Sequence, residues 1–292
     1  MIISGKTRVC ALIGDPVEHS LSPFIHNAAF EHLGLDYVYV VFRVKSEDLG
    51  KAIIGIKGLG IHGINVTMPH KIDVIRYLDE LDESAKTACS VNTILNDNGK
   101  LIGYTTDGAG ALMAMKYNNV DPFGKRILIL GAGGASRSIS FTLAKVAKKI
   151  VILNRTVKKA EMLAGNLMNS GVASEVLAFE LNKENLEAML SDSDILINAT
   201  SIGMNSDTET PVPPNLLRRN LVVFDLVYEP IETRLLRDAK LAGAKTIDGL
   251  SMLVHQGAAS FEIWTGIKAP IDLMLKVAKR RMLQLEKGGI NR

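Results

Sequence analysis

A glycine-rich turn between a predicted strand and a predicted helix constrains this chain more than any other feature. Gly131, Gly133 and Gly134 follow the apolar run 126–130 directly and open a segment with helical spacing. Glycines let the backbone turn tightly and approach a pyrophosphate, and the first amides of the helix are free to bind phosphate. Ser136 replaces the usual third glycine, but it is small enough for close packing. The turn predicts a dinucleotide site; a plain strand-to-helix turn is the alternative.

Regular alternation around this turn predicts the domain that carries it. Six short apolar runs, separated by segments long enough for crossover helices, are expected to be strands: 126–130, 150–153, 175–179, 194–198, 221–225 and 245–247. Six strands joined in this way are typical of a doubly wound, parallel dinucleotide-binding domain.

The two ends of the chain predict further α/β structure. Residues 8–13, 37–42 and 63–66 are expected to be strands, 23–33 a helix, and Lys71–Leu81 a second helix after Pro69. The last 45 residues predict two helices, 251–264 and 270–285, with the basic stretch Lys276–Arg281 facing water. A domain change is expected near 105–125, at the turn signal 118–124.

Composition restricts the class of protein. The chain has 292 residues, enough for two domains, and its 47% hydrophobic and 22% charged residues suit a soluble globular protein. A net charge of +3, without basic clusters, argues against nucleic-acid binding. Only Cys10 and Cys89 are present and the histidines lack metal-site spacing, so we expect neither disulfides nor a metal. Lys6 and Arg8 interrupt any signal peptide, and no apolar run is long enough to span a membrane. A cytoplasmic location is expected.

The segment after the second strand of the dinucleotide domain indicates which cofactor binds. An NAD site usually places a carboxylate there for the ribose 2′-hydroxyl. Here Asn154, Arg155 and Thr156 are followed by Lys158 and Lys159. The guanidinium of Arg155 can grip a 2′-phosphate, so the sequence favours NADP. A solvated basic loop is the alternative.

Four polar groups in the first domain lie at predicted strand ends or turns, where α/β active sites collect. Ser20 and Ser22 could both face one anion, although Ser22 could instead be a helix N-cap before Pro23. Asn65 and Thr67 alternate onto one face and precede Lys71, which alone would be taken for a solvated lysine. The remaining groups are Val91-Asn92-Thr93 and the loop with Asp107, which alone would be taken for an N-cap.

Together these groups resemble the shikimate and quinate dehydrogenase family over nearly the whole chain. Nine motifs occur in the family's order: HSLSP (19–23), NVTMPHK (65–71), AC-S-VNT (88–93), TTDGAG (105–110), LGAGGASR (130–137), NRT (154–156), NATSIGM (198–204), DLVYEP (225–230) and DGLSMLVHQGAASFEIWTG (248–266). The resemblance implies two domains. Residues 1–110 with 250–292 would form a substrate-binding catalytic domain, and 111–249 an NADP-binding Rossmann domain. It also suggests a homodimer.

The resemblance also implies residue roles. Lys71 and Asp107 would be catalytic. The serines would bind the substrate carboxylate, with Tyr228 nearby, and the others would surround the ring hydroxyls: Ser20, Ser22, Thr67, Lys71, Asn92, Asp107, Tyr228 and Gln256. The implied cofactor contacts are Glu83, Gly131, Ala132, Gly133, Gly134, Ala135, Asn154, Arg155, Thr156, Val157, Lys158, Lys159, Leu226 and Gly249. Glu83 could instead belong to an exposed helix face.

The implied activity is the NADPH-dependent, reversible reduction of 3-dehydroshikimate to shikimate in aromatic amino-acid biosynthesis. Lys71 would give a proton to the carbonyl oxygen as hydride arrives and take it back in reverse, while Asp107 orients the lysine. One alternative is a dehydrogenase that prefers quinate or accepts both acids. An alternative of another class is a non-catalytic NADP-binding regulatory protein, against which the presence of both Lys71 and Asp107 argues.

Overall fold

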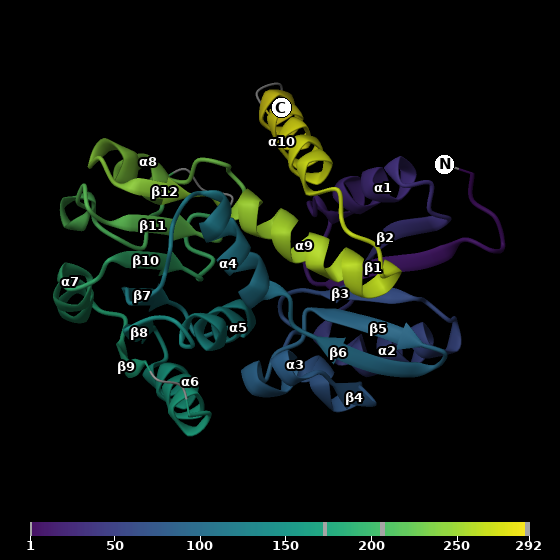
Figure 1. Ribbon diagram of the computed structural model, residues 1–292, viewed down its shortest axis with the longest axis horizontal. Coiled ribbons are helices and arrows are strands. Elements are labelled where there is room, and N and C mark those ends of the chain that lie inside the picture. Colours follow the sequence, from purple (N-terminus) through teal and green to yellow (C-terminus); the bar gives the residue numbers. More distant parts are fainter. Residues whose placement is uncertain (1, 172–173, 205–207, 290–292) are drawn as a thin grey trace. The chain divides into compact units, whose positions relative to one another are not determined.

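The computed structural model describes residues 2–171, 174–204 and 208–289 and divides the chain into two compact units (Figure 1). Unit 1 consists of Met1–Asp107 and Val254–Arg292, and unit 2 is Gly108–Leu253. Each end of unit 2 falls within a helix, α4 (Asp107–Tyr117) or α9 (Gly249–Thr265). Two helices therefore carry the chain from one unit to the other.

Unit 2 is built on a six-stranded parallel sheet with the order β12-β11-β10-β7-β8-β9, seen as a stack in Figure 1. Its strands are β7 (Arg126–Leu130), β8 (Lys149–Asn154), β9 (Glu175–Glu180), β10 (Ile195–Asn198), β11 (Val222–Asp225) and β12 (Lys245–Ile247). The order reverses between β7 and β10, which is the switch point where doubly wound sheets bind nucleotides. The predicted parallel six-stranded sheet is confirmed.

Helices supply the crossovers of unit 2. They are α5 (Gly134–Leu143), α6 (Val157–Asn169), α7 (Lys183–Ser191) and α8 (Arg234–Leu241), with the 3₁₀ turn η3 (Pro214–Leu216). The central strands are buried along their length, as near-continuous apolar runs require in a parallel sheet covered on both faces. Leu128, Leu196 and Val223 lie in a core that α7 and α8 help to close through Leu186 and Leu235.

Unit 1 contains a mixed sheet with the order β2-β1-β3-β5-β6-β4. Its strands are β1 (Arg8–Gly14), β2 (Tyr37–Arg43), β3 (Gly63–Val66), β4 (Glu80–Leu81), β5 (Thr93–Asp97) and β6 (Lys100–Tyr104). Strands β2, β1 and β3 are parallel, whereas β5 is antiparallel to both β3 and β6.

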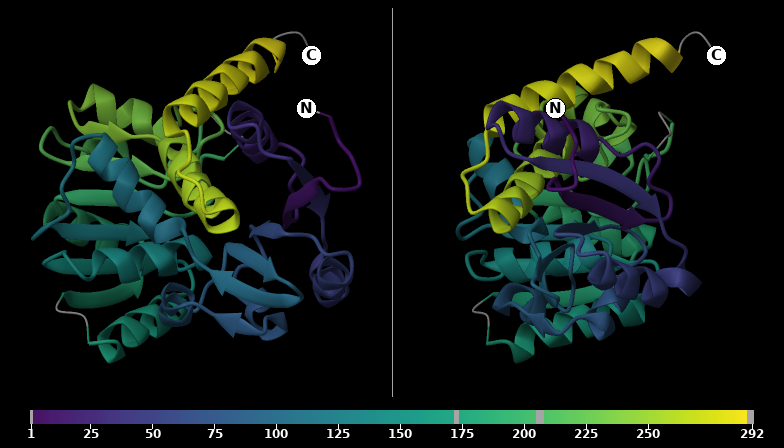
Figure 2. Two further views of the ribbon diagram at one scale, coloured as in Figure 1. Left: turned by 45° about the vertical axis from the view of Figure 1, so that its right-hand side comes forward. Right: turned by 90° about the vertical axis from the view of Figure 1, so that its right-hand side faces the viewer.

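Helices cover both faces of this sheet. They are α1 (Ser22–His32), α2 (Leu49–Gly58), α3 (Glu83–Ala88), α9 and α10 (Ile271–Gly289), with 3₁₀ turns η1 (Ser46–Asp48) and η2 (Asp73–Tyr77). Alternation along β3 separates the faces: Ile64 packs in a core with Ile53 of α2, whereas Gly63 closely approaches Trp264 of α9. Helix α10 runs beside α1 in both views of Figure 2.

Two local predictions are wrong. The helix expected over Lys71–Leu81 is only the short turn η2, because the backbone of Asp79 pairs with Leu101 and β4 joins the sheet beside β6. Tertiary pairing thus overrides helical spacing there. The stretch Lys276–Arg281 does not all face water, since the guanidinium of Arg281 lies 4.4 Å from the centre of the Phe24 ring. In the described part of the chain, no helix is long and apolar enough to cross a bilayer.

Candidate active site

A lysine–aspartate pair is the centre of the candidate site in unit 1. Lys71 follows β3 after the turn 67–70, and its Nζ lies 2.6 Å from Oδ2 of Asp107, the first residue of α4. The side chains are 18% and 4% exposed. A solvated Lys71 is therefore the wrong interpretation. An ammonium and a carboxylate held mostly out of water can exchange or donate a proton without solvent competing for them.

Two amide side chains extend the pair. Nδ2 of Asn92 donates to Oδ1 of Asp107 at 2.9 Å and to Oε1 of Gln256 at 3.0 Å. Asn92 is fully buried where the chain enters β5, and Gln256 comes from the part of α9 that belongs to unit 1. The structure thus brings together Lys71, Asn92, Asp107 and Gln256 from segments far apart in the sequence.

Further buried polar residues join this group that the sequence analysis did not select as site residues. Thr106 accepts from Nδ2 of Asn92 at 2.8 Å, and Thr93 donates to its Oδ1 at 3.0 Å. Ser260 lies 2.7 Å from Thr93, and Asn65 donates to Ser260 at 3.0 Å. Alternation in the sequence already groups Asn65 with Thr67, although it assigns Asn65 no role. Spacing could also have found Ser260, which is one helical turn after Gln256.

The two candidate serines lie at the start of α1. The backbone amide of Ser22 donates to Oγ of Ser20 at 3.2 Å, which holds the Ser20 hydroxyl against the first residue of α1. Ser22 is that first residue, and the N-cap is Leu21. The N-cap alternative for Ser22 is therefore wrong. Burial raises the pKa of the Tyr39 phenol on β2, and the nearby side chain of Ser22 opposes part of that rise.

Thr67 occupies the turn after β3. Its amide donates to the carbonyl of Ile13 at 2.9 Å, which ties the turn to the end of β1. The residue packed against the methyl group of Thr67 is Gly14. A Cβ on residue 14 would lie 2.3 Å from Cγ2 of Thr67, so glycine is required at that position. Glycine thus lets the end of β1 approach the segment that leads to Lys71.

The glycine turn of unit 2 has the geometry of a phosphate-binding loop. Gly131 directly follows β7 with φ 106°, and a Cβ there would lie 2.8 Å from the carbonyl oxygen of Ala199 after β10. The hydroxyl of Ser136 donates to the carbonyl of Gly131 at 2.6 Å, which closes the turn. Above Gly133 no atom lies within 4 Å of a Cβ position. Gly133 thus leaves open space beside the N-terminus of α5, which fits a pyrophosphate. Ala132, Gly134 and Ala135 are its neighbours in the turn and in the first residues of α5.

The basic loop follows β8 at the same edge of the sheet. Asn154 closes it by donating from Nδ2 to the carbonyl of Thr156 at 2.9 Å, and α6 begins at Val157. Arg155, Lys158 and Lys159 are exposed, and the described residues offer none of the three an ion-pair partner. Such a surface fits a 2′-phosphate, since three cations are available without breaking an existing pair.

The segment after β11 is braced by Asp225. This buried carboxylate accepts hydrogen bonds from Asn198, from the hydroxyl of Thr233 at 2.7 Å and from the amide of Val227. Burial raises the pKa of Asp225 to about 6 despite these donors. Gly249 is required nearby, because a Cβ would lie 2.4 Å from the carbonyl oxygen of Leu226. Burial also raises the pKa of Tyr228 to about 12.

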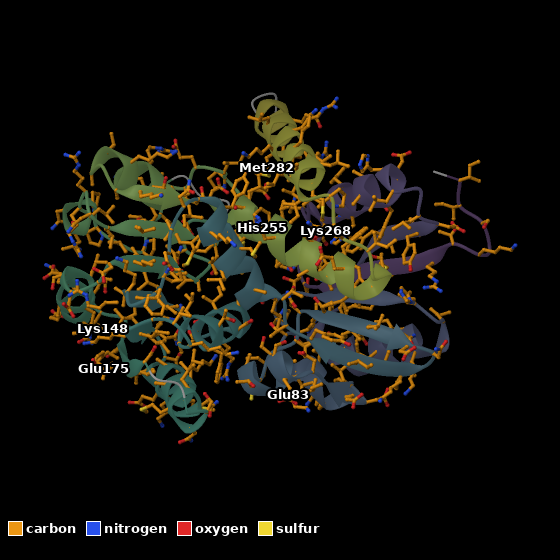
Figure 3. All side chains as sticks on the ribbon, viewed as in Figure 1. Glu83, Lys148, Glu175, His255, Lys268 and Met282 are labelled. Atoms are coloured by element: carbon orange, nitrogen blue, oxygen red, sulfur yellow. The ribbon has the colours of Figure 1, made fainter. Side chains whose placement is uncertain are left out.

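The remaining candidate, Glu83, lies in unit 1 at the first position of α3 and is labelled in Figure 3. Its side chain is 85% exposed and pairs with Lys86 at 2.7 Å. The substrate candidate Tyr228 belongs to unit 2, as do all the cofactor candidates except Glu83. Among the described residues, no three His, Cys, Asp or Glu side chains are arranged to hold a metal ion.

Three families match consecutive parts of this chain. Residues 12–94 match the shikimate dehydrogenase substrate binding domain, 113–246 match shikimate / quinate 5-dehydrogenase, and 249–279 match the shikimate 5′-dehydrogenase C-terminal domain. A shikimate dehydrogenase (NADP(+)) of Thermococcus kodakarensis is 51% identical over 269 residues, which are 92% of this chain and 95% of the relative.

Solved structures agree with these matches. A shikimate dehydrogenase in complex with NADP+ is similar with a TM-score of 0.89 and 48% identity, covering 96% of this chain and 98% of its own. A shikimate 5-dehydrogenase of Listeria monocytogenes, in complex with shikimate and NAD, has a TM-score of 0.86 and 40% identity, covering 94% and 97%. The similarity therefore extends over both units.

Proposed function

Because the chain belongs to the shikimate dehydrogenase family, we propose that it catalyses the NADPH-dependent, reversible reduction of 3-dehydroshikimate to shikimate in aromatic amino-acid biosynthesis. The observation that carries this proposal is the shielded pair of Lys71 and Asp107, with 2.6 Å between Nζ and Oδ2. Reduction of a ketone needs a proton at the oxygen as hydride reaches the carbon, and this pair can supply it.

Lys71 is the group proposed to move the proton. Its ammonium donates to the substrate oxygen during reduction, and its amine accepts the proton during oxidation. Asp107 orients the ammonium and is itself fixed by the donated hydrogen bond from Asn92 at 2.9 Å. NADP supplies or accepts the hydride when bound. Because the chain holds the substrate beside Lys71, the proton is transferred within one complex, and this raises the rate of the reaction.

The substrate contacts follow from the same placement. Ser20 and Ser22 are proposed to bind the carboxylate, supported by the Ser20 hydroxyl lying 3.2 Å from the amide of Ser22 at the start of α1. The ring hydroxyls are assigned to side chains around the pair, namely Thr67, Lys71, Asn92, Asp107 and Gln256. Tyr228 of unit 2 is proposed near the carboxylate.

The cofactor contacts are proposed in unit 2. The amides at the start of α5 would bind the pyrophosphate, and Arg155, Thr156 and Lys158 the 2′-phosphate. The full set is Glu83, Gly131, Ala132, Gly133, Gly134, Ala135, Asn154, Arg155, Thr156, Val157, Lys158, Lys159, Leu226 and Gly249. Exposure of the basic loop and the open space above Gly133 support this assignment. Glu83 has the least support, because its side chain already pairs with Lys86.

Larger-scale features complete the proposal. Residues 1–110 with 250–292 are proposed as the substrate-binding catalytic domain and 111–249 as the NADP-binding Rossmann domain. Cys10 and Cys89 are free thiols, which suits a reducing compartment, and we propose a cytoplasmic location. A homodimer is proposed on the family resemblance alone.

One spectrophotometric assay tests the activity against its alternatives. Oxidation of shikimate and of quinate is followed at about 340 nm, the reduced-nicotinamide band, with NADP and with NAD. We expect the highest kcat/KM for shikimate with NADP. A hundredfold preference for quinate with NAD would establish the alternative dehydrogenase. No reduction of either cofactor by either acid, together with measurable NADP binding, would instead support the non-catalytic regulatory protein.

Replacing Lys71 tests the assigned mechanism. Lys71→Ala removes the proton carrier, so we expect turnover of shikimate to fall by about 10²–10⁴-fold. NADP affinity, measured by titration, is expected to stay unchanged because Lys71 lies in unit 1 and the phosphate contacts are assigned to unit 2. Turnover close to that of the unsubstituted enzyme would exclude Lys71 as the acid–base residue.

A further inference from the structure

A line of buried polar side chains runs through unit 1 from Tyr39 to Asp107. We propose that Tyr39 is a positioning residue at the start of this line, acting on Asp107 through Asn65, Ser260, Thr93 and Asn92. The proposal deepens the function given above and rests on it. The line contains five buried polar side chains. Each needs a hydrogen-bond partner that an apolar side chain in the same position would not need, so their presence calls for an explanation.

The direction of hydrogen bonding is fixed at the Asp107 end. The backbone amide of Thr106 donates to Oδ1 of Asn92 at 2.8 Å, and a backbone amide can only donate. Nδ2 of Asn92 must therefore face Oδ1 of Asp107, at 2.9 Å. In the opposite orientation two oxygens would face each other. The orientation of Asn92 thus decides whether Asp107 receives a hydrogen bond on the oxygen not used by Lys71.

The direction is also fixed at the Tyr39 end. Nδ2 of Asn65 donates to the backbone carbonyl of Asn92 at 3.1 Å, which can only accept. Oδ1 of Asn65 consequently faces Tyr39 and accepts from its hydroxyl at 2.7 Å. Tyr39 itself is 2% exposed, and its ring stacks on His26 with 4.5 Å between the centres. Its hydroxyl therefore has little freedom to move away from Asn65.

The hydroxyls between these ends can be aligned in the same direction. Thr93 donates to Oδ1 of Asn92 at 3.0 Å, and its oxygen then accepts from Ser260 at 2.7 Å. Ser260 in turn accepts from Nδ2 of Asn65 at 3.0 Å. In this arrangement the donors from Tyr39 to Asn92 point toward Asp107, and the alternative donation from Ser260 goes to the carbonyl of Gln256 at 3.1 Å. Hydrogen bonds aligned in one direction polarise and strengthen one another in a buried setting.

The line begins beside a residue proposed to bind substrate. Burial raises the pKa of Tyr39, and the side chain of Ser22 lies close enough to the phenol to oppose part of that rise. Neighbouring His26 is uncharged near neutral pH, because burial lowers its pKa to about 3, so no cation competes for the phenol oxygen. Tyr39 therefore links the proposed carboxylate contact to the proton-handling pair through side chains of unit 1 alone.

Tyr39→Phe removes one hydroxyl from this line and leaves Oδ1 of Asn65 without its donor. We expect kcat for shikimate to fall about tenfold, because the barrier to the chemical step rises. KM and NADP affinity should change less than about threefold. Tyr37→Phe is the matched control, since Tyr37 lies two residues earlier on β2 and its hydroxyl accepts from Arg8 at 3.1 Å and from no other described residue. The control is expected to retain its kcat.

Variants of Thr93 distinguish a positioning role of its hydroxyl from a packing role of its side chain. Thr93→Val removes the hydroxyl but keeps the shape, and we expect a fall in kcat similar to that of Tyr39→Phe. Thr93→Ser keeps the hydroxyl and should recover most of that loss. Because both act on one line, the double variant with Tyr39→Phe and Thr93→Val should lose less than the product of the single effects.

The outcomes are decisive in either direction. Unchanged kcat in Tyr39→Phe and Thr93→Val, with an active unsubstituted enzyme, would overturn the inference. Equal losses in Thr93→Val and Thr93→Ser would also overturn it, since shape rather than hydrogen bonding would then matter. An unsubstituted enzyme inactive on shikimate with NADP would instead refute the proposed function. The expected pattern, lowered kcat with recovery by serine, is one that simple loss of packing does not produce.

Discussion

At the scale of single residues, the proposed chemistry depends on contacts between residues that are distant in the sequence. Lys71 and Asp107 are 36 residues apart, and each alone has an ordinary explanation. Their contact requires the turn after β3 and the start of α4 to meet, which spacing alone does not indicate. By contrast, one requirement for glycine at 131 is local, because the turn itself has φ of 106°. The other, the close approach of the Ala199 carbonyl oxygen, is distant in sequence.

Asp107→Asn tests the orienting carboxylate. It keeps the shape but removes the charge that faces Lys71, so we expect kcat/KM for shikimate to fall about 10²-fold or more. Glu80→Gln is the matched control, because Glu80 also lies 2.6 Å from its partner Lys100 but both side chains are about half exposed. An exposed pair contributes little. Equal losses in the two variants would contradict a specific role for Asp107.

Arg155→Ala tests the choice of cofactor. A charge-assisted hydrogen bond to the 2′-phosphate would be lost, so we expect NADP affinity to fall about 10- to 100-fold. NAD affinity should hardly change. Lys148→Ala is the control, because Lys148 precedes β8 while Arg155 follows it, at the other end of the same strand (Figure 3). Parallel losses for NADP and NAD in Arg155→Ala would mean that the residue does not read the 2′-phosphate.

At the scale of elements, the parallel strands were predictable because each is a short apolar run with clear ends. The predicted runs 63–66, 126–130 and 245–247 match β3, β7 and β12 residue for residue. The hairpin of β5 and β6 was not predicted, although Asn98 and Gly99, both with positive φ, form the two-residue turn that favours one. The helix expected over Lys71–Leu81 failed for another reason: its last residues pair with β6, a contact distant in sequence.

Gly249→Ala tests the close approach at the start of α9. The added Cβ would meet the carbonyl oxygens of Leu226 and Val227 at 2.4 and 2.5 Å, and backbone cannot move aside cheaply. We expect the free energy of unfolding to fall by about 1–3 kcal/mol. Gly165→Ala in α6 is the control, since no atom lies within 4 Å of its Cβ position. It should stabilise by up to about 1 kcal/mol.

Thermal unfolding of these two variants should therefore shift in opposite directions. A loss of stability in both would mean that glycine is needed for flexibility in general and not for the contact beside Leu226. A gain in both would mean that the segment 226–227 relaxes away from α9.

At the scale of the whole molecule, two units with separate sheets and cores share two helices, α4 and α9. Sequence alternation was sufficient to predict the sheet of unit 2, because parallel strands and their crossovers are sequential. The sheet of unit 1 was less predictable, since it mixes parallel and antiparallel pairs and adds helices from the far end of the chain. The buried line from Tyr39 to Asp107 was hidden for the same reason: Ser260 reaches it from α9, 167 residues after Thr93.

Stability should carry a pH dependence from Asp225. Its pKa is about 6 in the folded chain against an ordinary value of 3.8, because burial outweighs three hydrogen bonds. Between these values the folded chain binds more protons than the unfolded chain, so unfolding free energy falls as pH rises from about 4 to about 6. The contribution of this one group is roughly 1–3 kcal/mol. It is fully present below the unfolded pKa and lost above the folded one.

Asp225→Asn isolates this contribution, since an amide keeps the shape and does not titrate. Hydrogen exchange of β10 and β11 reports on it locally, because Asp225 bonds to Asn198 at the end of β10. We expect unsubstituted chain and variant to differ by an amount that declines from pH 4 to 7. Asp194→Asn is the control: Arg126 lowers the pKa of Asp194 to about 2, so that difference should be constant over the same range. A difference for Asp225→Asn that stays constant or grows with pH would contradict burial as the dominant influence, and the brace after β11 would then owe its stability to its hydrogen bonds.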